Sequence, residues 1–187
     1  TSLGTGIEGS IAILEIDTAG NIYAAGSFED VNGTSARNIA VWNGTNWSSL
    51  TDTSNLVSGT NNEIRSLAFD DSGILYVGGN FDEAGGVTAN RIATWDGANW
   101  GTLGAGTSGF VEAIATTPTD IYIGGNFALA GGVTVNRIAK WNKNNSTWSP
   151  LGNGLSNVAN SLIHDGSNLY VAGSFNLANN GPNNSII

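Results

Sequence analysis

Several residue types are missing or scarce in this 187-residue sequence, and each absence narrows its chemistry. There is no cysteine and no methionine, only three prolines and a single histidine, His164. Without cysteine the chain forms neither disulfides nor thiolate metal sites, and one histidine alone does not make a typical zinc or copper site. No run of about 18 apolar residues is present to span a membrane as a helix. We therefore expect no metal, no cofactor and no membrane insertion.

Positive charge is also scarce. Six Lys and Arg residues stand against fifteen Asp and Glu residues, which gives a net charge of −9. Residues 1–100 hold twelve of the acids and three of the cations, so nearly all the excess charge lies in the first half. Without a basic stripe to neutralise phosphates, nucleic acid is not an expected partner. The acidity predicts solubility or, alternatively, a polarised molecule that packs end to end.

What the sequence does contain is an internal repeat. The phrase LYVGGNFDEAGGVTANRIATWDGANW at 75–100 returns at 121–148, more loosely at 22–47, and begins again at 169. Each of the four tyrosines lies five residues before a phenylalanine, and each of these phenylalanines lies eleven before an isoleucine. The spacing between the phenylalanines is 46 to 53 residues. Periods of this length are typical of solenoids, propellers and arrays.

The apolar pattern inside each repeat predicts strands. No segment keeps a 3.6-residue period, and short runs of β-forming residues alternate with Gly, Asn, Asp and Ser clusters. We expect a first strand at 11–16, 64–69, 111–116 and 159–164. The Tyr-x-x-Gly-x-Phe run forms the second strand, a loop such as 82–89 follows, Ile-Ala-x-Trp forms the third, and the fourth begins at the second tryptophan.

Four strands every 45 to 50 residues predict an all-β β-propeller with four blades of four antiparallel strands. We treat 1–187 as one domain with repeats at approximately 1–47, 48–100, 101–148 and 149–187. Because the chain does not start with methionine, we expect a processed chain or a fragment of a longer array.

The two ends of the sequence complement each other. The first residues match the fourth strand of a blade, and the last residues match a third strand that lacks its fourth. We predict that they pair, so that the N-terminal strand completes the last blade and closes the ring, or completes a blade of a neighbouring molecule by strand exchange. The residues concerned are Thr1, Ser2, Leu3, Gly4, Asn184, Ser185, Ile186 and Ile187.

The phrase Tyr-x-Gly-Gly-x-Phe, Ala-Gly-Gly-Val, Asn-Arg-Ile-Ala-x-Trp resembles the kelch-like, galactose-oxidase-like propeller repeats of secreted and cell-surface proteins, mainly bacterial. This resemblance covers essentially the whole chain. It implies a propeller fold, an extracellular or cell-surface location and a role as an adhesin or surface module. Galactose oxidase chemistry is not implied, because its copper site needs cysteine and more than one histidine.

The tryptophans allow two interpretations. They pack between blades, or they form platforms on which sugars stack, as in propeller lectins. All six fall at fixed places in the repeat: Trp42, Trp47, Trp95, Trp100, Trp141 and Trp148.

Other polar positions favour structural roles over chemistry. Acidic pairs at 29–30, 70–71 and 82–83 suit solvated turns better than a calcium or glycosidase site. For the arginines that recur before the third strand we expect bonds to backbone carbonyls or to an acidic side chain, and the alternative is that they hold a carboxylated ligand; they are Arg37, Arg91 and Arg137. The extra residues at 51–62 indicate a surface insertion or a binding loop. Six sequons permit glycosylation in a suitable host, at Asn32, Asn43, Asn46, Asn144, Asn145 and Asn183.

No histidine-serine pair or Gly-x-Ser-x-Gly elbow indicates a nucleophile, and we expect no catalytic residues. The sequence therefore predicts a non-enzymatic extracellular propeller that acts in surface adhesion or self-assembly, with other protein chains as partners. The alternative is a carbohydrate-binding lectin that uses the inter-blade tryptophans to bind glycans.

Overall fold

The computed structural model describes residues 7–176, and within them the chain is entirely β, with nineteen strands and no helix. Three consecutive sheets have the same antiparallel order, in which the strands follow one another from the inside outward. Sheet 1 contains β1 (Ile7–Ile16), β2 (Ile22–Val31), β4 (Ile39–Trp42) and β5 (Trp47–Ser49), with β3 (Thr34–Ser35) paired to β2; sheet 2 contains β6 (Ile64–Phe69), β7 (Leu75–Gly79), β10 (Ile92–Trp95) and β11 (Trp100–Thr102); sheet 3 contains β12 (Phe110–Thr116), β13 (Asp120–Asn126), β16 (Ile138–Asn142) and β17 (Thr147–Pro150). Sheet 4 is the hairpin of β18 (Ala159–His164) and β19 (Leu169–Gly173).

These bounds confirm the predicted strands closely, and the one clear difference lies in the predicted loop at 82–89. This segment forms a small hairpin of β8 (Glu83–Ala84) and β9 (Val87–Thr88), and sheet 3 repeats it as β14 (Leu129–Ala130) and β15 (Val133–Thr134). Its two-glycine turn has positive φ at both residues, 55° and 79° at Gly85 and Gly86, as two-residue hairpin turns require.

Every innermost strand carries a β-bulge at the same place. The register of β1 with β2 shifts between Ile11 and Ile13, and equivalent shifts occur in β6, β12 and β18. The partner opposite each bulge is the second small residue of the Tyr-x-x-Gly motif, such as Gly79 opposite Ile64. A Cβ on Gly79 would collide with the carbonyl oxygen of Glu63. The glycine of the motif is therefore required by the close approach of the bulged backbone.

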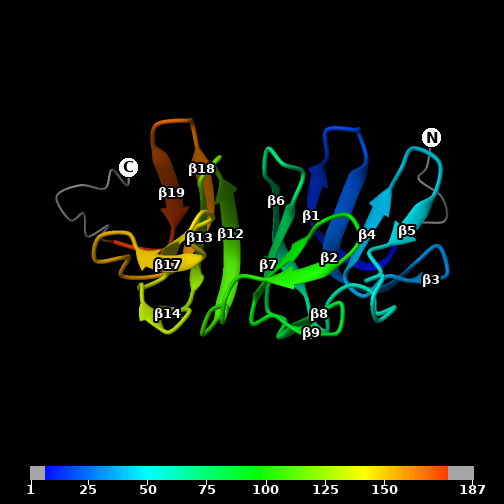
Figure 1. Ribbon diagram of the computed structural model, residues 1–187, viewed down its shortest axis with the longest axis horizontal. Coiled ribbons are helices and arrows are strands. Elements are labelled where there is room, and N and C mark those ends of the chain that lie inside the picture. The colour runs from blue at the N-terminus through cyan, green and yellow to red at the C-terminus, as the bar shows by residue number, and fades with distance from the viewer. Residues whose placement is uncertain (1–6, 177–187) are drawn as a thin grey trace.

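The sheets stand face against face in a row, with the innermost strands side by side in chain order, β1, β6, β12 and β18 (Figure 1). Three apolar clusters fill the spaces between neighbours. The first joins sheets 1 and 2 around Ile39 and Ile64, the second joins sheets 2 and 3 around Ile92 and Ile121, and the third joins sheets 3 and 4 around Ile138. Packing of successive four-stranded sheets in this manner is the arrangement of propeller blades.

The row of described sheets is an open arc. β1 and β18 lie in the two terminal sheets and do not pack against each other, whereas each of the other neighbouring inner strands does. Within the described residues, the four sheets therefore do not form a closed ring. The predicted pairing of residues 1–4 with 184–187 lies outside the described residues.

Candidate functional site

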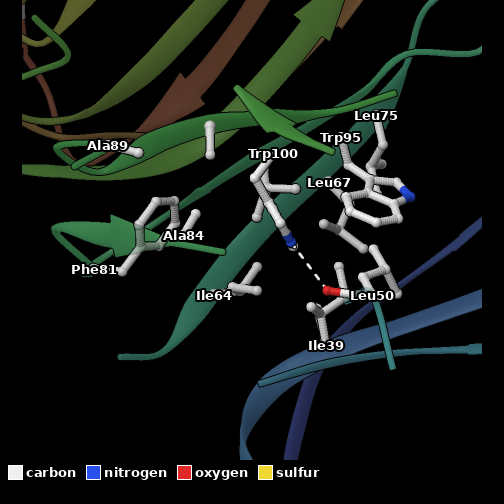
Figure 2. Close-up of a cluster of buried hydrophobic side chains, with 13 residues drawn as sticks. Ile39, Leu50, Ile64, Leu67, Leu75, Phe81, Ala84, Ala89, Trp95 and Trp100 are labelled. Atoms are coloured by element: carbon white, nitrogen blue, oxygen red, sulfur yellow. Dashed lines mark hydrogen bonds between the residues drawn. The ribbon is translucent and has the colours of Figure 1, made fainter. Parts of the chain in front are cut away.

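The tryptophans of the fourth strands of sheets 2 and 3 lie in the interfaces between sheets, whereas Trp47 of sheet 1 is half-buried and packs within its own sheet. Trp100 and Trp148 are 6% and 8% exposed, and their indole Nε1 atoms donate to the carbonyl oxygens of Leu50 (3.0 Å) and Leu103 (3.1 Å) in the preceding sheet. Figure 2 shows Trp100 reaching across the first apolar cluster to Leu50. Each of these indoles therefore packs and hydrogen-bonds between blades, and neither offers a free face to a sugar.

The tryptophans of the third strands are more varied in exposure. Each pairs with its partner across the turn at a ring-centroid distance of 5.1 to 5.6 Å. Trp95 is buried, while Trp42 and Trp141 are half-buried. Trp141 borders a surface hollow of about 290 Å³ that Val133, Trp148 and the chain around Gly104 complete. This hollow is the place in the described chain where the aromatic platform of the lectin hypothesis has both an aromatic wall and open space.

Asp70 holds two sheets together at the edge where the inner hairpins turn. Its carboxylate accepts hydrogen bonds from the Lys143 Nζ of sheet 3 (3.0 Å) and from the Tyr76 hydroxyl (3.2 Å). The Asp70 side chain is 3% exposed. Burial alone would raise the pKa of Asp70, but Lys143 and the amide N–H groups of Ile74 and Ser72 outweigh it and lower the pKa. The same surroundings, burial first and Asp70 second, raise the pKa of Tyr76.

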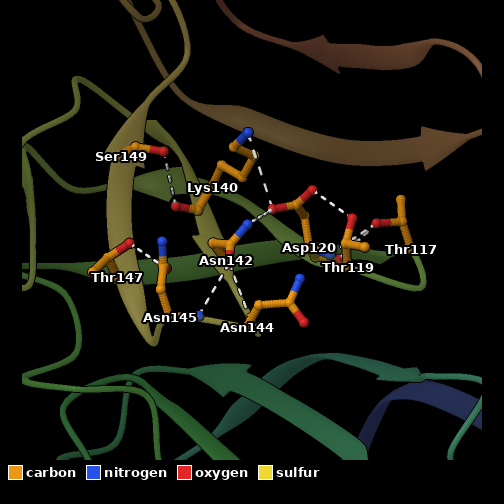
Figure 3. Close-up of polar contacts among 9 residues, drawn as sticks. All are labelled: Thr117, Thr119, Asp120, Lys140, Asn142, Asn144, Asn145, Thr147 and Ser149. Atoms are coloured by element: carbon orange, nitrogen blue, oxygen red, sulfur yellow. Dashed lines mark hydrogen bonds and ion pairs between the residues drawn. The ribbon is translucent and has the colours of Figure 1, made fainter.

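A second polar network covers the outer turn of sheet 3. Asn142 donates to Asp120 at 3.0 Å and accepts from the backbone N–H of Asn144 at 3.0 Å, while Lys140 Nζ lies 4.0 Å from the same carboxylate (Figure 3). The sequon residues Asn144 and Asn145 are exposed here. Asn32, Asn43 and Asn46 are exposed in sheet 1 as well, and Asn183 lies outside the described residues. These exposed asparagines are sterically open to glycosylation, which stays a prediction.

Sequence reasoning missed the ion pairs on the inner strands. Arg65 lies between Glu63 and Glu112 of the next sheet and bonds to both, with its guanidinium 4.9 Å from the ring centre of Phe110. Arg65 and Glu112 are the extra residues of their bulges, which the register skips. The signal was present in the sequence, because opposite charges occupy the same position of successive repeats, but only the bulge brings them together.

His164 has a structural environment. Its ring stacks on Tyr122 of sheet 3 at 5.8 Å between centroids, and its Nδ1 accepts a hydrogen bond from the Gly166 N–H at 3.0 Å. A surface hollow of about 530 Å³ lies beside this pair and also borders Asp71 and Asp120. Among the described residues, no group of three or more histidine, cysteine or acidic side chains is placed to hold a metal ion.

The remaining polar positions serve the connections between sheets. Arg137 lies at φ 69° and donates to the Leu155 carbonyl oxygen at 3.4 Å, which confirms the predicted backbone contact for this arginine. In the extra segment at 51–62, the buried carboxylate of Asp52 accepts from the Trp100 N–H at 2.9 Å. Asn55 donates to the Gly85 carbonyl oxygen at 2.6 Å. Asp52 and Asn55 therefore anchor this segment to sheet 2, residues 53–56 lie exposed at the surface as expected of a surface insertion, and the binding-loop alternative stays a prediction.

Five of the eight large apolar side chains that are exposed among the described residues lie on the two terminal faces of the row, and the other three are Leu56, Leu129 and Val133. We define the β1 face as Ile11, Leu14 and Ile16, which are 49%, 58% and 62% exposed. We define the β19 face as Ile163, Tyr170 and Ala172; Ile163 is 65% and Tyr170 38% exposed. No described segment is a helix long and apolar enough to cross a membrane.

Comparisons with known proteins agree on the fold. Residues 101–186, which include sheets 3 and 4, match the family described as the Rax2 C-terminal beta propeller domain. A solved structure of the extracellular domain of BT4673 from B. thetaiotaomicron, described as a hybrid two component system, superposes with a TM-score of 0.54 at 16% identity, over 91% of this chain and 20% of that one. A second BT4673 structure, described as the extracellular domain of a one component system, gives 0.35 at 16% identity over 83% of this chain and 24% of that one. No curated protein matches the sequence.

This chain is an all-β β-propeller. It spans about a fifth of the length of the first solved structure that it resembles. The propeller part of the expected resemblance is thus confirmed, and its kelch-like or galactose-oxidase-like character stays a prediction. The number of blades in the complete ring is likewise a prediction.

Proposed function

We propose that this chain is a non-enzymatic, extracellular propeller module that acts in self-assembly or surface adhesion. The observation that carries the proposal is the exposure of two apolar faces, one at each end of the row of sheets. Isolated exposed apolar residues are ordinary, but contiguous apolar patches on a sheet face mark interaction sites. The extracellular location is supported by the similarity to the BT4673 structure, which is an extracellular domain.

The non-enzymatic part of the proposal rests on how the chemistry-bearing side chains are used. Asp70 is tied to Lys143 and to its own turn, and the Nδ1 atom of His164 is engaged by the Gly166 N–H. Groups that already satisfy one another in the folded chain are poorly placed to act on a substrate.

Binding to surfaces tests this proposal directly. Fluorescently labelled protein is incubated with cells and with protein-coated surfaces, and its self-association is measured in parallel by sedimentation. We expect saturable surface binding or concentration-dependent association, and both should decline when Leu14 and Ile163 are replaced together by Asp. A protein that stays monomeric and binds no surface would contradict the proposal.

The lectin alternative has one specific observation in its favour, the hollow beside the half-buried Trp141. Sugars stack on exposed aromatic rings that have polar groups at their edge. A glycan array with the wild type and with Trp141→Ala distinguishes this alternative. Glycan binding that Trp141→Ala abolishes, while Trp42→Ala retains it, would favour the lectin over the assembly module.

A further inference from the structure

The interfaces between neighbouring sheets of the row all follow one pairing rule. In each interface, the innermost strand of the later sheet directs three side chains, at alternating positions, toward the earlier sheet. In sheet 2 these side chains are Ile64, Leu67 and Phe69. In sheet 3 the same positions are Val111, Ile114 and Thr116. All but the last position of each set are buried inside the row. The β1 face consists of these three positions of sheet 1.

The earlier sheet of each interface contributes a tyrosine and a small residue to the contact. The tyrosine packs on the third position of the next sheet, as in Tyr23 with Phe69 (5.0 Å between ring centres) and Tyr122 with His164. The small residue two places later leaves room for the first position. A Cβ on Gly78 would lie 2.6 Å from Val111, and one on Gly124 would lie 2.7 Å from Ala159. The β19 face holds the same positions as Tyr170 and Ala172.

The two terminal faces are therefore the two halves of one interface. Among the described residues, the β19 face offers a tyrosine and a small residue with no following sheet, and the β1 face offers three apolar side chains with no preceding sheet. The sizes match as well. Between sheets 1 and 2, Ala25 and Ile64 share one apolar cluster, and the terminal faces carry the same residue types at these positions, Ala172 and Ile11.

We infer that the partner of these faces is a second copy of this chain, docked head to tail so that Tyr170 covers Ile16 and Ala172 covers Ile11. This inference rests on the proposed self-assembly and names the partner and the orientation. The contact continues the established interface between sheets, with Tyr170 in the place of Tyr23 and Ile16 in the place of Phe69. It is heterologous, so that each added copy leaves one free face at either end.

Charge favours this orientation over a symmetric one. The first 100 residues carry twelve acids and three cations, while residues 101–187 carry three of each. Two β1 faces brought together would oppose two strongly acidic halves. A β1 face against a β19 face brings an acidic half to a nearly neutral one, which avoids that repulsion.

Complementary single-face variants test the inference. Leu14→Asp blocks the β1 face and Ile163→Asp blocks the β19 face, and both positions are exposed, so the charge leaves the fold intact. Thr18→Asp and Ser167→Asp, in the exposed turns beside the two faces, are the charge-matched controls. Mass in solution is measured for each protein, and for mixtures, by sedimentation over a range of concentrations; circular dichroism checks folding.

We expect the wild type and both controls to form oligomers that grow with concentration. Either blocked variant alone should associate about tenfold or more weakly, because an uncompensated carboxylate enters the apolar contact. An equimolar mixture of the two should form dimers and stop there, because the one pair of intact faces is then used.

Other outcomes overturn the inference and separate it from the proposed function. If both single-face variants assemble as well as the wild type, the head-to-tail contact is refuted while self-assembly remains in place. A wild type that stays monomeric but binds cell surfaces would also refute it, and adhesion would remain. A monomer that both variants destabilise would mean that the faces close on each other within one chain.

Discussion

The inner interfaces of the row and its two terminal faces are built from equivalent positions of the same repeat, yet they differ sharply in burial. Leu67, between sheets 1 and 2, is 5% exposed, whereas Leu14, at the same position of sheet 1, is 58% exposed. Phe69 packs on Tyr23, but its counterpart Ile16 is 62% exposed. The repeat thus fixes which way a side chain points, and the neighbouring sheet decides whether it is buried.

This difference in burial indicates which contacts contribute most to the stability of the molecule. In repeat proteins, stability is approximately a sum over units and the interfaces between neighbours. Most of the large buried apolar side chains gather in the three clusters that join one sheet to the next, and a smaller cluster around Phe28 and Val31 lies within sheet 1. Substitutions at inner interfaces should therefore cost much more than the same substitutions at the ends.

The largest expected effect is at Trp100. Replacing Trp100 by Ala removes a buried indole and its hydrogen bond to Leu50, so the free energy of unfolding should fall by about 3–5 kcal/mol. Chemical denaturation measures the change. The control is Trp42→Ala at the half-buried position in sheet 1, which should cost clearly less. Equal losses at the two positions would mean that inner interfaces do not dominate stability.

Leu67 and Leu14 occupy the same position in sheets 2 and 1, and they test the difference between an inner interface and a terminal face with a smaller side chain. Leu67→Ala should lower the free energy of unfolding by about 2–5 kcal/mol, because it leaves a cavity in the first apolar cluster. Leu14→Ala, measured at a concentration where the chain is monomeric, should change it by only about 0.5 kcal/mol. A comparable loss for Leu14→Ala would show that the β1 face is covered within one molecule.

Much of the fold could be predicted from the sequence because the repeat supplies four versions of each strand. The first strands expected at 64–69 and 159–164 coincide with β6 and β18. Apolar alternation and turn residues are local signals, and they are sufficient to locate such strands. Closure of the ring is not local, since it depends on the angle between neighbouring sheets, which the sizes of many interface side chains set together.

The candidate site was harder to predict for a related reason. Trp141 and Trp148 occupy fixed places in the repeat, but only the structure shows that Trp148 donates its indole N–H to the preceding sheet. The anchoring of the 51–62 segment could not be predicted, because the bond between Asp52 and Trp100 joins positions 48 residues apart. The Trp148 bond recurs at Trp100, but the repeat alone does not show which atoms of neighbouring sheets meet. The exposed terminal faces, by contrast, follow once the repeat positions are compared.

The smallest expected effect concerns the ion pair between Asp70 of sheet 2 and Lys143 of sheet 3. Lys143→Met removes the cation that bonds to the buried carboxylate of Asp70, and we expect the free energy of unfolding at neutral pH to fall by about 1–3 kcal/mol. The control is Lys140→Met. The Lys140 side chain is 36% exposed and its Nζ lies 4.0 Å from Asp120, so the loss of free energy of unfolding should be within about 1 kcal/mol.

The pH dependence of stability tests the same ion pair through its other member, Asp70. The pKa of Asp70 is lowered in the folded chain from an ordinary value of 3.8, so below that value the unfolded chain binds more protons than the folded one. The stabilisation is therefore complete above about pH 4 and is lost as the pH falls through the folded pKa. We expect the wild type to lose stability more steeply than Lys143→Met below about pH 4, so that their difference narrows. A difference that stays constant down to pH values well below the ordinary pKa would show that Lys143 stabilises the interface through its aliphatic stem and not through its charge.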